Sequence, residues 1–175
     1  MVGNDPFEVL TTSVPKAIAK PEGAAPPGRG RRRDRPLGKQ DVDLLAAVPL
    51  FAELPRRHVR RLAERADVTS FREREHIVDE GQPGGTFYVI VQGEATVSRR
   101  GRTLTTLGPG DFFGEISLLD GGPRSADVIA QTPVAAIRIF KRSFDKMLAE
   151  EPGVAAKILA VTARRLRNTE RAPRN

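Results

Sequence analysis

The sequence contains no cysteine among its 175 residues and only two histidines, His58 and His76. The absence of cysteine excludes disulfide bridges, thiolate nucleophiles and thiolate metal ligands. Neither histidine lies in a metal-ligand pattern, and lone histidines of this kind are more often surface or core residues than ligands. No nucleophile motif accompanies them. We therefore predict a protein that is not an enzyme and that has neither a metal site nor a cofactor.

Long apolar runs are also missing. No stretch approaches the roughly 18 consecutive apolar residues that a membrane-spanning helix needs. The N-terminus has no basic segment followed by an apolar one, which is the pattern of a secretory signal. With 39% hydrophobic and 29% charged residues, the composition is typical of a globular, cytoplasmic protein without a transmembrane segment.

The positive charge is concentrated at the two ends of the chain. Residues 1–40 hold eight Lys or Arg against four Asp or Glu, and residues 164–175 hold five Arg against one Glu. The sequence between these ends is nearly neutral. Basic ends can meet nucleic acid, an anionic membrane or an acidic partner, or can simply keep a small domain in solution.

Proline and glycine mark the domain boundaries. Residues 1–40 contain six Pro and five Gly without apolar periodicity. Such a segment cannot bury enough apolar surface to offset the entropy of ordering it, so we predict a disordered basic tail. The predicted domain spans residues 41–170, and residues 171–175 form a second short basic tail.

Helical periodicity opens the predicted domain. Residues 41–48 are expected to form a short amphipathic helix with Asp41 as its N-cap. Residues 54–66 are expected to form a second helix that Pro55 opens, with apolar residues on one face and arginines on the other.

Two further helices are predicted to close the domain, at residues 141–152 and 153–170. The second has apolar residues near helical spacing and becomes basic towards its C-terminus, where cations suit the helix dipole. Its apolar face either packs on its own domain or forms a homodimer interface, and the sequence leaves both open. These apolar residues are Val154, Ile158, Val161 and Leu166.

Between the two pairs of helices the apolar period is two, and turn residues recur at regular intervals. The strands should be antiparallel, because parallel strands would need helical crossovers. The predicted fold is therefore mainly β with flanking α: an eight-stranded antiparallel jelly roll with N-terminal helices and two C-terminal helices. The predicted strands are 68–71, 76–78, 86–91, 95–99, 103–107, 111–113, 125–130 and 134–140.

The stretch FGEISLLDGGPRSA places a carboxylate and a guanidinium on either side of a Gly-Gly-Pro turn. Gly114 has no side chain, so a ligand can approach its backbone closely. Glu115 accepts hydrogen bonds and would suit a sugar hydroxyl, whereas the planar fork of Arg124 matches a phosphate. Ser125 adds a hydroxyl, and the small Ala126 leaves room. The segment predicts a compact site for a phosphate fused to a ribose.

This stretch resembles the phosphate-binding cassette of the cyclic nucleotide-binding domain family. The resemblance extends roughly from Leu44 to Thr169 and includes the upstream EGQPGGTFYVIVQGEATV, which resembles the family's glycine-punctuated hairpin. It implies that Gly114 and Glu115 bind the ribose 2′-hydroxyl and that Arg124 binds the cyclic phosphate.

The resemblance also implies roles for the neighbouring residues. Ser125 and Ala126 would contact the same phosphate, and Ile116 would belong to the apolar turn of the cassette. In the last helix, Thr169 falls where a threonine of the family reaches adenine, and Arg165 is placed to pair with Glu115.

We therefore expect a single-domain sensor that binds a cyclic nucleotide, cAMP in preference to cGMP, and that moves its C-terminal helices to control an effector protein. The preference for cAMP rests on Ser125 and Thr169. The sequence continues for six residues after Thr169, so we expect no helix-turn-helix DNA-binding domain. The alternative is a basic-tailed adaptor for nucleic acid or an anionic membrane, built on a jelly roll that no longer binds nucleotide.

Overall fold

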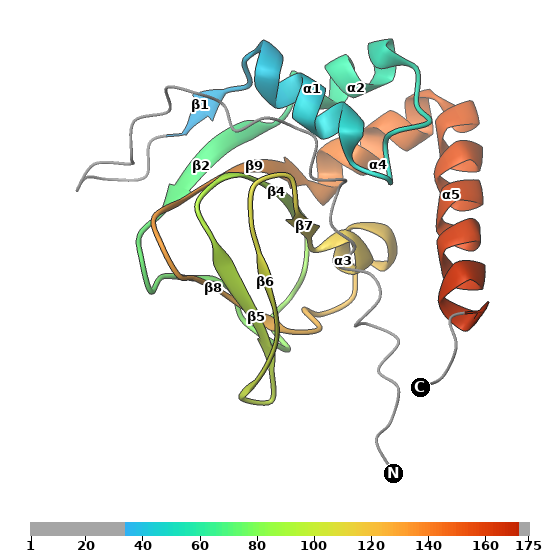
Figure 1. The fold of residues 1–175 in the computed structure, drawn as a ribbon. Coiled ribbons are helices and arrows are strands. Elements are labelled where there is room, and N and C mark those ends of the chain that lie inside the picture. The colour runs from blue at the N-terminus through green and yellow to red at the C-terminus, as the bar shows by residue number, and fades with distance from the viewer. Residues whose placement is uncertain (1–33, 172–175) are drawn as a thin grey trace.

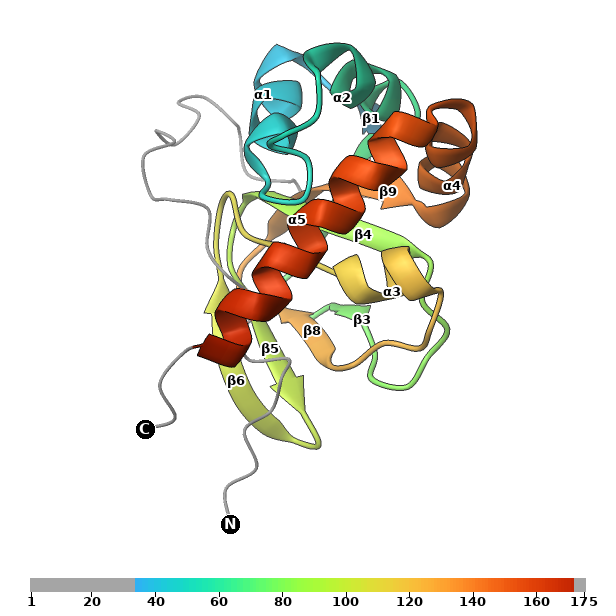
Figure 2. The ribbon, with the colours of Figure 1, turned by 90° about the vertical axis from the view of Figure 1, so that its right-hand side faces the viewer.

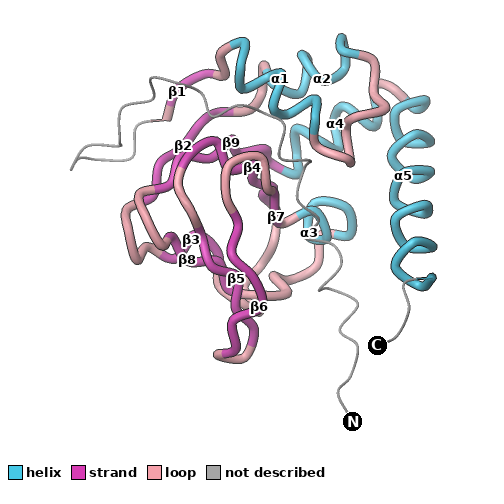
Figure 3. Tube along the Cα trace, in the orientation of Figure 1, coloured by secondary structure: helices cyan, strands magenta, loops and turns pink. Residues whose placement is uncertain are grey.

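The computed structural model describes the backbone of residues 34–171 and their side chains, apart from those of residues 161, 162 and 164–171. The helices gather at one end of the molecule and the strands form a roll at the other (Figures 1 and 3). Of the tails predicted for residues 1–40 and 171–175, residues 1–33 and 172–175 lie outside the described residues.

The ordered domain begins before the predicted boundary at residue 41. A short strand, β1 (Arg35–Pro36), pairs antiparallel with the first strand of the roll, and helix α1 (Lys39–Ala47) follows it. The prediction that the whole of residues 1–40 forms a tail is therefore wrong for its last seven residues. Their placement is stabilised by Arg35, whose guanidinium lies 2.6 Å from a carboxylate oxygen of Asp41.

The start of α1 also corrects the prediction for Asp41. Gly38 is the N-cap, and Asp41 lies in the first turn of the helix. Its Oδ2 accepts a hydrogen bond of 2.7 Å from the backbone N–H of Gly38. A carboxylate in the first turn thus satisfies a donor that the helix itself leaves open, which is the second half of a capping box. Helix α2 (Arg56–Ala63) follows with Pro55 before its first residue, as predicted.

All eight predicted strands are confirmed, with their ends shifted by at most two residues. In the described residues they form two antiparallel sheets, one in the order β1-β2-β9-β4-β7 and the other in the order β3-β8-β5-β6. The two sheets pack face to face as an antiparallel roll, and the mainly-β fold with flanking helices is confirmed. The strands are β2 (Asp67–Phe71), β3 (His76–Val78), β4 (Thr86–Gln92), β5 (Ala95–Arg99), β6 (Arg102–Leu107), β7 (Phe112–Phe113), β8 (Asp127–Ala130) and β9 (Val134–Phe140).

Strand β4, inside the five-stranded sheet, is buried on both faces, which explains its nearly continuous apolar sequence. Phe87 and Val89 face the helical layer and join its core, whereas Tyr88 and Ile90 face the inside of the roll. This alternation follows from the two-residue period of a strand. The fold thus has three layers, with helices on one face of this sheet and the second sheet on the other.

The two predicted C-terminal helices are present as α4 (Lys141–Glu150) and α5 (Pro152–Arg171). Val154 and Ile158 pack into the core of the helical layer, whereas Leu159 is 70% exposed. The helix then runs down one side of the molecule, past the level of the short helix α3 (Glu115–Asp120) (Figures 1 and 2). The side chains of Val161 and Leu166 lie outside the described ones.

No helix within residues 34–171 combines the length and the apolar character that crossing a membrane requires.

Candidate functional site

A cavity of about 260 Å³ opens between α3, the loop that leads into β8, and strands β5 and β6. The helix α3 lies on the side of the roll along which α5 runs (Figure 2). The lining falls into two groups that we name the cassette wall and the hairpin wall. The cassette wall comprises Phe113, Gly114, Glu115, Ile116, Ser117, Arg124, Ser125 and Ala126; the hairpin wall comprises Val97, Arg99, Leu104 and Thr105; Val78 and Val128 complete the lining.

The structure brings together all six residues of the predicted cassette. Gly114, Glu115 and Ile116 come from the start of α3, and Arg124, Ser125 and Ala126 come from the loop before β8. A tight loop joins the two segments and brings them side by side. Residues that are nearly ten positions apart in the sequence therefore line the same cavity.

Gly114 is required both by its backbone angle and by its surroundings. It is the N-cap of α3 with φ of 87°, a conformation that costs residues with a Cβ atom free energy. An added Cβ would lie 2.6 Å from the carbonyl oxygen of Thr86 and 2.7 Å from Nη1 of Arg124. Only a residue without a Cβ atom can therefore bring its backbone this close to the guanidinium of Arg124.

Arg124 is a buried cation at the cassette wall, with 8% of its surface exposed. Its Nη1 donates a hydrogen bond of 2.7 Å to the backbone oxygen of Thr86. Burial lowers the pKa of the guanidinium from its ordinary value, and the Tyr88 hydroxyl opposes that shift. Arginine nevertheless stays protonated in proteins, so the cavity holds a poorly hydrated positive charge. Such a charge is suited to an anion that would replace its lost hydration.

Glu115 is the buried carboxylate of the same wall, with 6% of its surface exposed. As an ionised carboxylate it can only accept hydrogen bonds, so the donor groups of a ligand are the partners that it suits. Ile116 is half-buried and adds an apolar contact, and Ser125 and Ala126 are half-buried beside the guanidinium. The wall therefore combines a hydroxyl acceptor with an anion site.

The loop of residues 79–84 holds the cassette wall in place by backbone hydrogen bonds. The N–H of Gly81 donates to the oxygen of Arg124, and the N–H of Arg124 donates to the oxygen of Gln82, each at 2.9 Å. Gly84 packs so tightly that an added Cβ would lie 2.3 Å from Cβ of Ser117. These bonds fix the backbone from which the guanidinium projects.

The hairpin wall was not identified by the sequence analysis. Val97 and Arg99 lie on one face of β5, because alternate residues of a strand point the same way. Leu104 and Thr105 come from β6. The strand periodicity of residues 95–99 indicated a shared face for Val97 and Arg99, but the sequence did not show that this face lines the cavity.

Thr169 and Arg165, the remaining predicted site residues, lie on the C-terminal part of α5. Their side chains are outside the described ones. The structure therefore tests neither the predicted contact of Thr169 with a base nor the predicted pair between Arg165 and Glu115.

Taken together, the cavity defines a class of site: a small-molecule pocket with a buried guanidinium, a buried carboxylate and an apolar wall. A ligand with an anion, a hydroxyl and a flat ring system matches these three features. The family model described as "Cyclic nucleotide-binding domain" matches residues 68–151, which include both the cassette wall and the hairpin wall. The chain belongs to the cyclic nucleotide-binding domain family.

The chain is similar in sequence to two groups of curated proteins. A CRP-like cAMP-activated global transcriptional regulator of Mycobacterium tuberculosis is 32% identical over 132 residues, which are 73% of this chain and 59% of that protein. A cAMP-dependent protein kinase regulatory subunit of Emericella nidulans is 35% identical over 106 residues, which are 59% of this chain and 26% of that protein. The chain thus spans only part of the length of the curated relatives that it matches.

Solved structures show the same fold. The N-terminal domain of a transcriptional regulator from Streptomyces coelicolor is 32% identical, with a TM-score of 0.68 over 74% of this chain and 94% of that one. A cyclic nucleotide-binding domain from Methylobacillus flagellatus is 25% identical, with a TM-score of 0.62 over 75% of this chain and 76% of that one. The predicted fold class is thereby confirmed for this regulatory cyclic nucleotide-binding domain.

Proposed function

We propose that this chain is a cAMP sensor whose cassette wall binds the cyclic phosphate and the ribose. In this proposal the guanidinium of Arg124 and the hydroxyl of Ser125 bind the phosphate oxygens, with the small Ala126 beside them. The carboxylate of Glu115 accepts a hydrogen bond from the ribose 2′-hydroxyl, and the backbone of Gly114 allows the sugar to approach closely.

The observation that supports this proposal most directly is the buried Arg124. A guanidinium that has lost most of its hydration costs free energy unless other groups replace the water. Among the described residues, the carbonyl oxygen of Thr86 accepts a hydrogen bond of 2.7 Å from one of the five N–H donors of this guanidinium. A cyclic phosphate would accept two further hydrogen bonds and neutralise the charge in the same step.

The preference for cAMP is supported by the relatives. The names of the Mycobacterium tuberculosis regulator and of the kinase regulatory subunit both specify cAMP. In this chain, adenine would extend from the ribose towards the hairpin wall, with Thr169 on α5 as a further contact and Arg165 as a partner of Glu115.

The conformational change on ligand binding would be transmitted to the C-terminal helices through α3. The Nζ of Lys141, the first residue of α4, donates a hydrogen bond of 3.1 Å to the backbone oxygen of Leu118 in α3. At the other end of α4, Glu151 lies between α4 and α5 and pairs with Arg61 at 2.6 Å. A shift of α3 around the ligand would therefore move the start of α4 and change the direction of α5. An effector protein, or a second copy of the chain, would then bind the repositioned helix.

A ligand can shift such an equilibrium only by its difference in affinity for the two helix positions. Because the chain has no cysteine, paired spin labels can be attached without background at Thr106→Cys on β6 and Ala163→Cys on α5, both exposed. We expect saturating cAMP to change the distance distribution between the two labels. An unchanged distribution with bound cAMP would exclude the helix movement and leave the binding proposal standing.

The test of binding itself is calorimetric titration of the intact chain with cAMP and, separately, with cGMP. We expect micromolar or tighter binding of cAMP, and a loss of roughly 2–5 kcal/mol in Arg124→Ala, the range for removing one partner of a buried charge pair. The matched control is Arg72→Ala, an exposed arginine that does not line the cavity. No heat and no thermal stabilisation with either nucleotide would overturn the proposal.

A further inference from the structure

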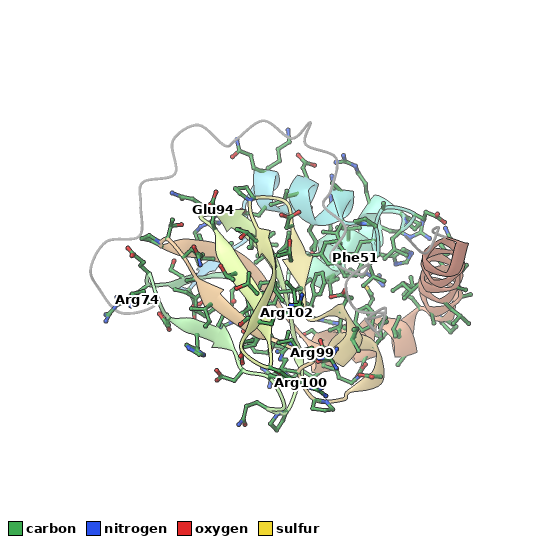
Figure 4. The ribbon with its side chains drawn as sticks, turned by 60° about the horizontal axis from the view of Figure 1, so that its bottom comes forward. Phe51, Arg74, Glu94, Arg99, Arg100 and Arg102 are labelled. Carbon is green, nitrogen blue, oxygen red and sulfur yellow. The ribbon has the colours of Figure 1, made fainter. Side chains whose placement is uncertain are left out.

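The hairpin wall contains a single charged side chain, that of Arg99. Arg99 is the last residue of β5, its side chain is 27% exposed, and it shares its strand face with the apolar Val97. Figure 4 shows Arg99, Arg100 and Arg102 together at the β5–β6 hairpin. Of these three arginines, only Arg99 lines the cavity. Arg99 is thus a second arginine along the pocket, on a strand separate from the segment that carries Arg124.

Glu80 positions this guanidinium. Its Oε1 lies 3.9 Å from Nε of Arg99, and its Oε2 accepts a hydrogen bond of 2.8 Å from the backbone N–H of Arg100. The backbone N–H of Glu80 donates a bond of 2.7 Å to Oδ1 of Asp127, which directly follows the cassette residues. Glu80 therefore connects the tip of the hairpin to the loop that carries Arg124, and it places a carboxylate beside the guanidinium of Arg99.

The remaining residues of this wall suit a flat ring system. Val97 and Leu104 present apolar surface, and Thr105 adds one hydroxyl. If the cyclic phosphate binds at Arg124, as the proposed function requires, the purine has the hairpin wall as its other contact surface. The edge of the ring would then face the guanidinium of Arg99.

A guanidinium distinguishes the two purines by the groups on this edge. Arginine has only donors, five N–H groups in a planar fork. Guanine presents two acceptors, O6 and N7, to which such a fork binds bidentately, whereas adenine presents the N7 acceptor next to an N6 amino donor. A guanine can therefore accept two hydrogen bonds from Arg99, at O6 and at N7. An adenine can accept only one, at N7, because its N6 amino group is a donor that faces the N–H donors of Arg99.

We infer that Arg99 is a specificity-determining residue that binds the guanine edge of cGMP, so that the pocket accepts cGMP in addition to cAMP. Glu80 is its positioning residue. This inference rests on the proposed function, because it needs the cyclic phosphate to bind at the cassette wall.

The test is calorimetric titration of the intact chain and of Arg99→Leu with cAMP, cGMP and cyclic IMP. Cyclic IMP carries O6 and N7 but lacks the 2-amino group of guanine. We expect Arg99→Leu to weaken cGMP and cyclic IMP by about five- to a hundredfold, the range for one bidentate contact to guanine. Binding of cAMP should change by less than about threefold. Arg102→Leu is the matched control, because Arg102 pairs with Arg99 across the hairpin but does not line the cavity.

The positioning role of Glu80 is tested by a double-mutant cycle. Glu80→Gln keeps an oxygen for the N–H of Arg100 but removes the charge that faces Arg99. We expect it to weaken cGMP relative to cAMP in the intact background and to leave that ratio unchanged in the Arg99→Leu background. An equal change in both backgrounds would show that Glu80 acts on the fold rather than through Arg99.

The possible failures can be told apart. If the unmodified chain binds neither nucleotide, both the proposed function and this inference are wrong. If it binds cAMP but not cGMP, or if Arg99→Leu weakens both equally or neither, the proposed function stands and the inference about Arg99 is wrong.

Discussion

The two walls of the cavity are built in different ways. The cassette wall consists of two short segments that a tight loop brings together, with a glycine in a left-handed conformation and two buried charges, Glu115 and Arg124. The hairpin wall consists of the alternate residues Val97 and Arg99 of β5 and the consecutive residues Leu104 and Thr105 of β6, where the pairing register shifts. Its charged residue, Arg99, has a side chain that is 27% exposed. One strand of this wall, β6, lies at the edge of its sheet.

This difference has an energetic consequence. At the cassette wall, backbone approach and buried charge leave little room for substitution, since neighbouring atoms cannot move without breaking hydrogen bonds. At the hairpin wall, the half-buried side chains of Arg99, Leu104 and Thr105 can change while the backbone pairing of the two strands is kept. We therefore expect changes in the cassette wall to affect folding or all ligands, and changes in the hairpin wall to affect the choice between ligands.

The largest effect should come from Gly114→Ala. An alanine would have to adopt φ of 87° and would bring its Cβ to 2.6 Å from the oxygen of Thr86. Left-handed strain and overpacking together cost roughly 2–5 kcal/mol, measured as the free energy of unfolding in urea. Gly108→Ala is the matched control, because no atom lies within 4 Å of its added Cβ. A similar small loss in both variants would mean that the cassette wall is not tightly constrained.

Glu115→Gln should weaken the contact with one part of the ligand, the ribose. Replacing a charged acceptor by a neutral amide weakens the hydrogen bond from the ribose 2′-hydroxyl, and bonds to charged groups contribute about 1.5–3 kcal/mol. We expect cAMP binding to fall by that amount in calorimetric titration. The control ligand is 2′-deoxy-cAMP, which has no hydroxyl to lose and should bind the variant and the unmodified chain almost equally. An equal loss for both ligands would contradict the assignment of Glu115 to the ribose.

Arg124→Met should separate binding from stability. Burial lowers the pKa of the guanidinium, so the charged form is less favourable in the folded chain than in water and opposes folding. Methionine removes that cost, but it leaves the oxygen of Thr86 without its donor. These two effects have opposite signs, and we expect the free energy of unfolding without nucleotide to change by no more than about 1 kcal/mol. Binding should be lost in the same variant. A loss of stability above about 3 kcal/mol would show that Arg124 is mainly structural.

The two walls also differ in how far the sequence could predict them. Gly114, Glu115 and Arg124 lie in one short stretch whose chemistry can be inferred from neighbouring residues, and the structure places them in one cavity. Arg99 could be assigned to a strand face, but which face lines the cavity depends on the pairing of β5 with β8, a contact between distant parts of the chain. Sequence periodicity carries no information on that pairing.

The N-terminal boundary was missed for a related reason. The strand β1 has only two residues, Arg35 and Pro36, within a stretch whose composition predicts disorder. Its pairing with Val68 and Asp67 is a long-range contact that local sequence patterns do not predict. The capping role of Asp41, by contrast, could have been found from its spacing of three residues from Gly38.

The smallest effect should come from the turn that closes the hairpin wall. Arg100 and Gly101 form the two-residue turn between β5 and β6, with φ of 49° and 74°. Two positive φ angles define the type I′ hairpin turn, for which Asn-Gly is strongly preferred and arginine is not. Arg100→Asn should therefore raise the free energy of unfolding by about 0.5–1 kcal/mol, because asparagine adopts the left-handed conformation at lower cost.

In Arg100→Asn the backbone N–H that Glu80 accepts is retained, so we expect Arg99 to keep its place and the ratio of cAMP to cGMP affinity to stay unchanged. The same substitution at Arg102, which lies in β6 rather than in the turn, should give no such gain in stability. A stabilised Arg100→Asn variant with an altered ratio would mean that the turn itself reaches the base. The choice between purines would then depend on the whole hairpin rather than on Arg99 alone.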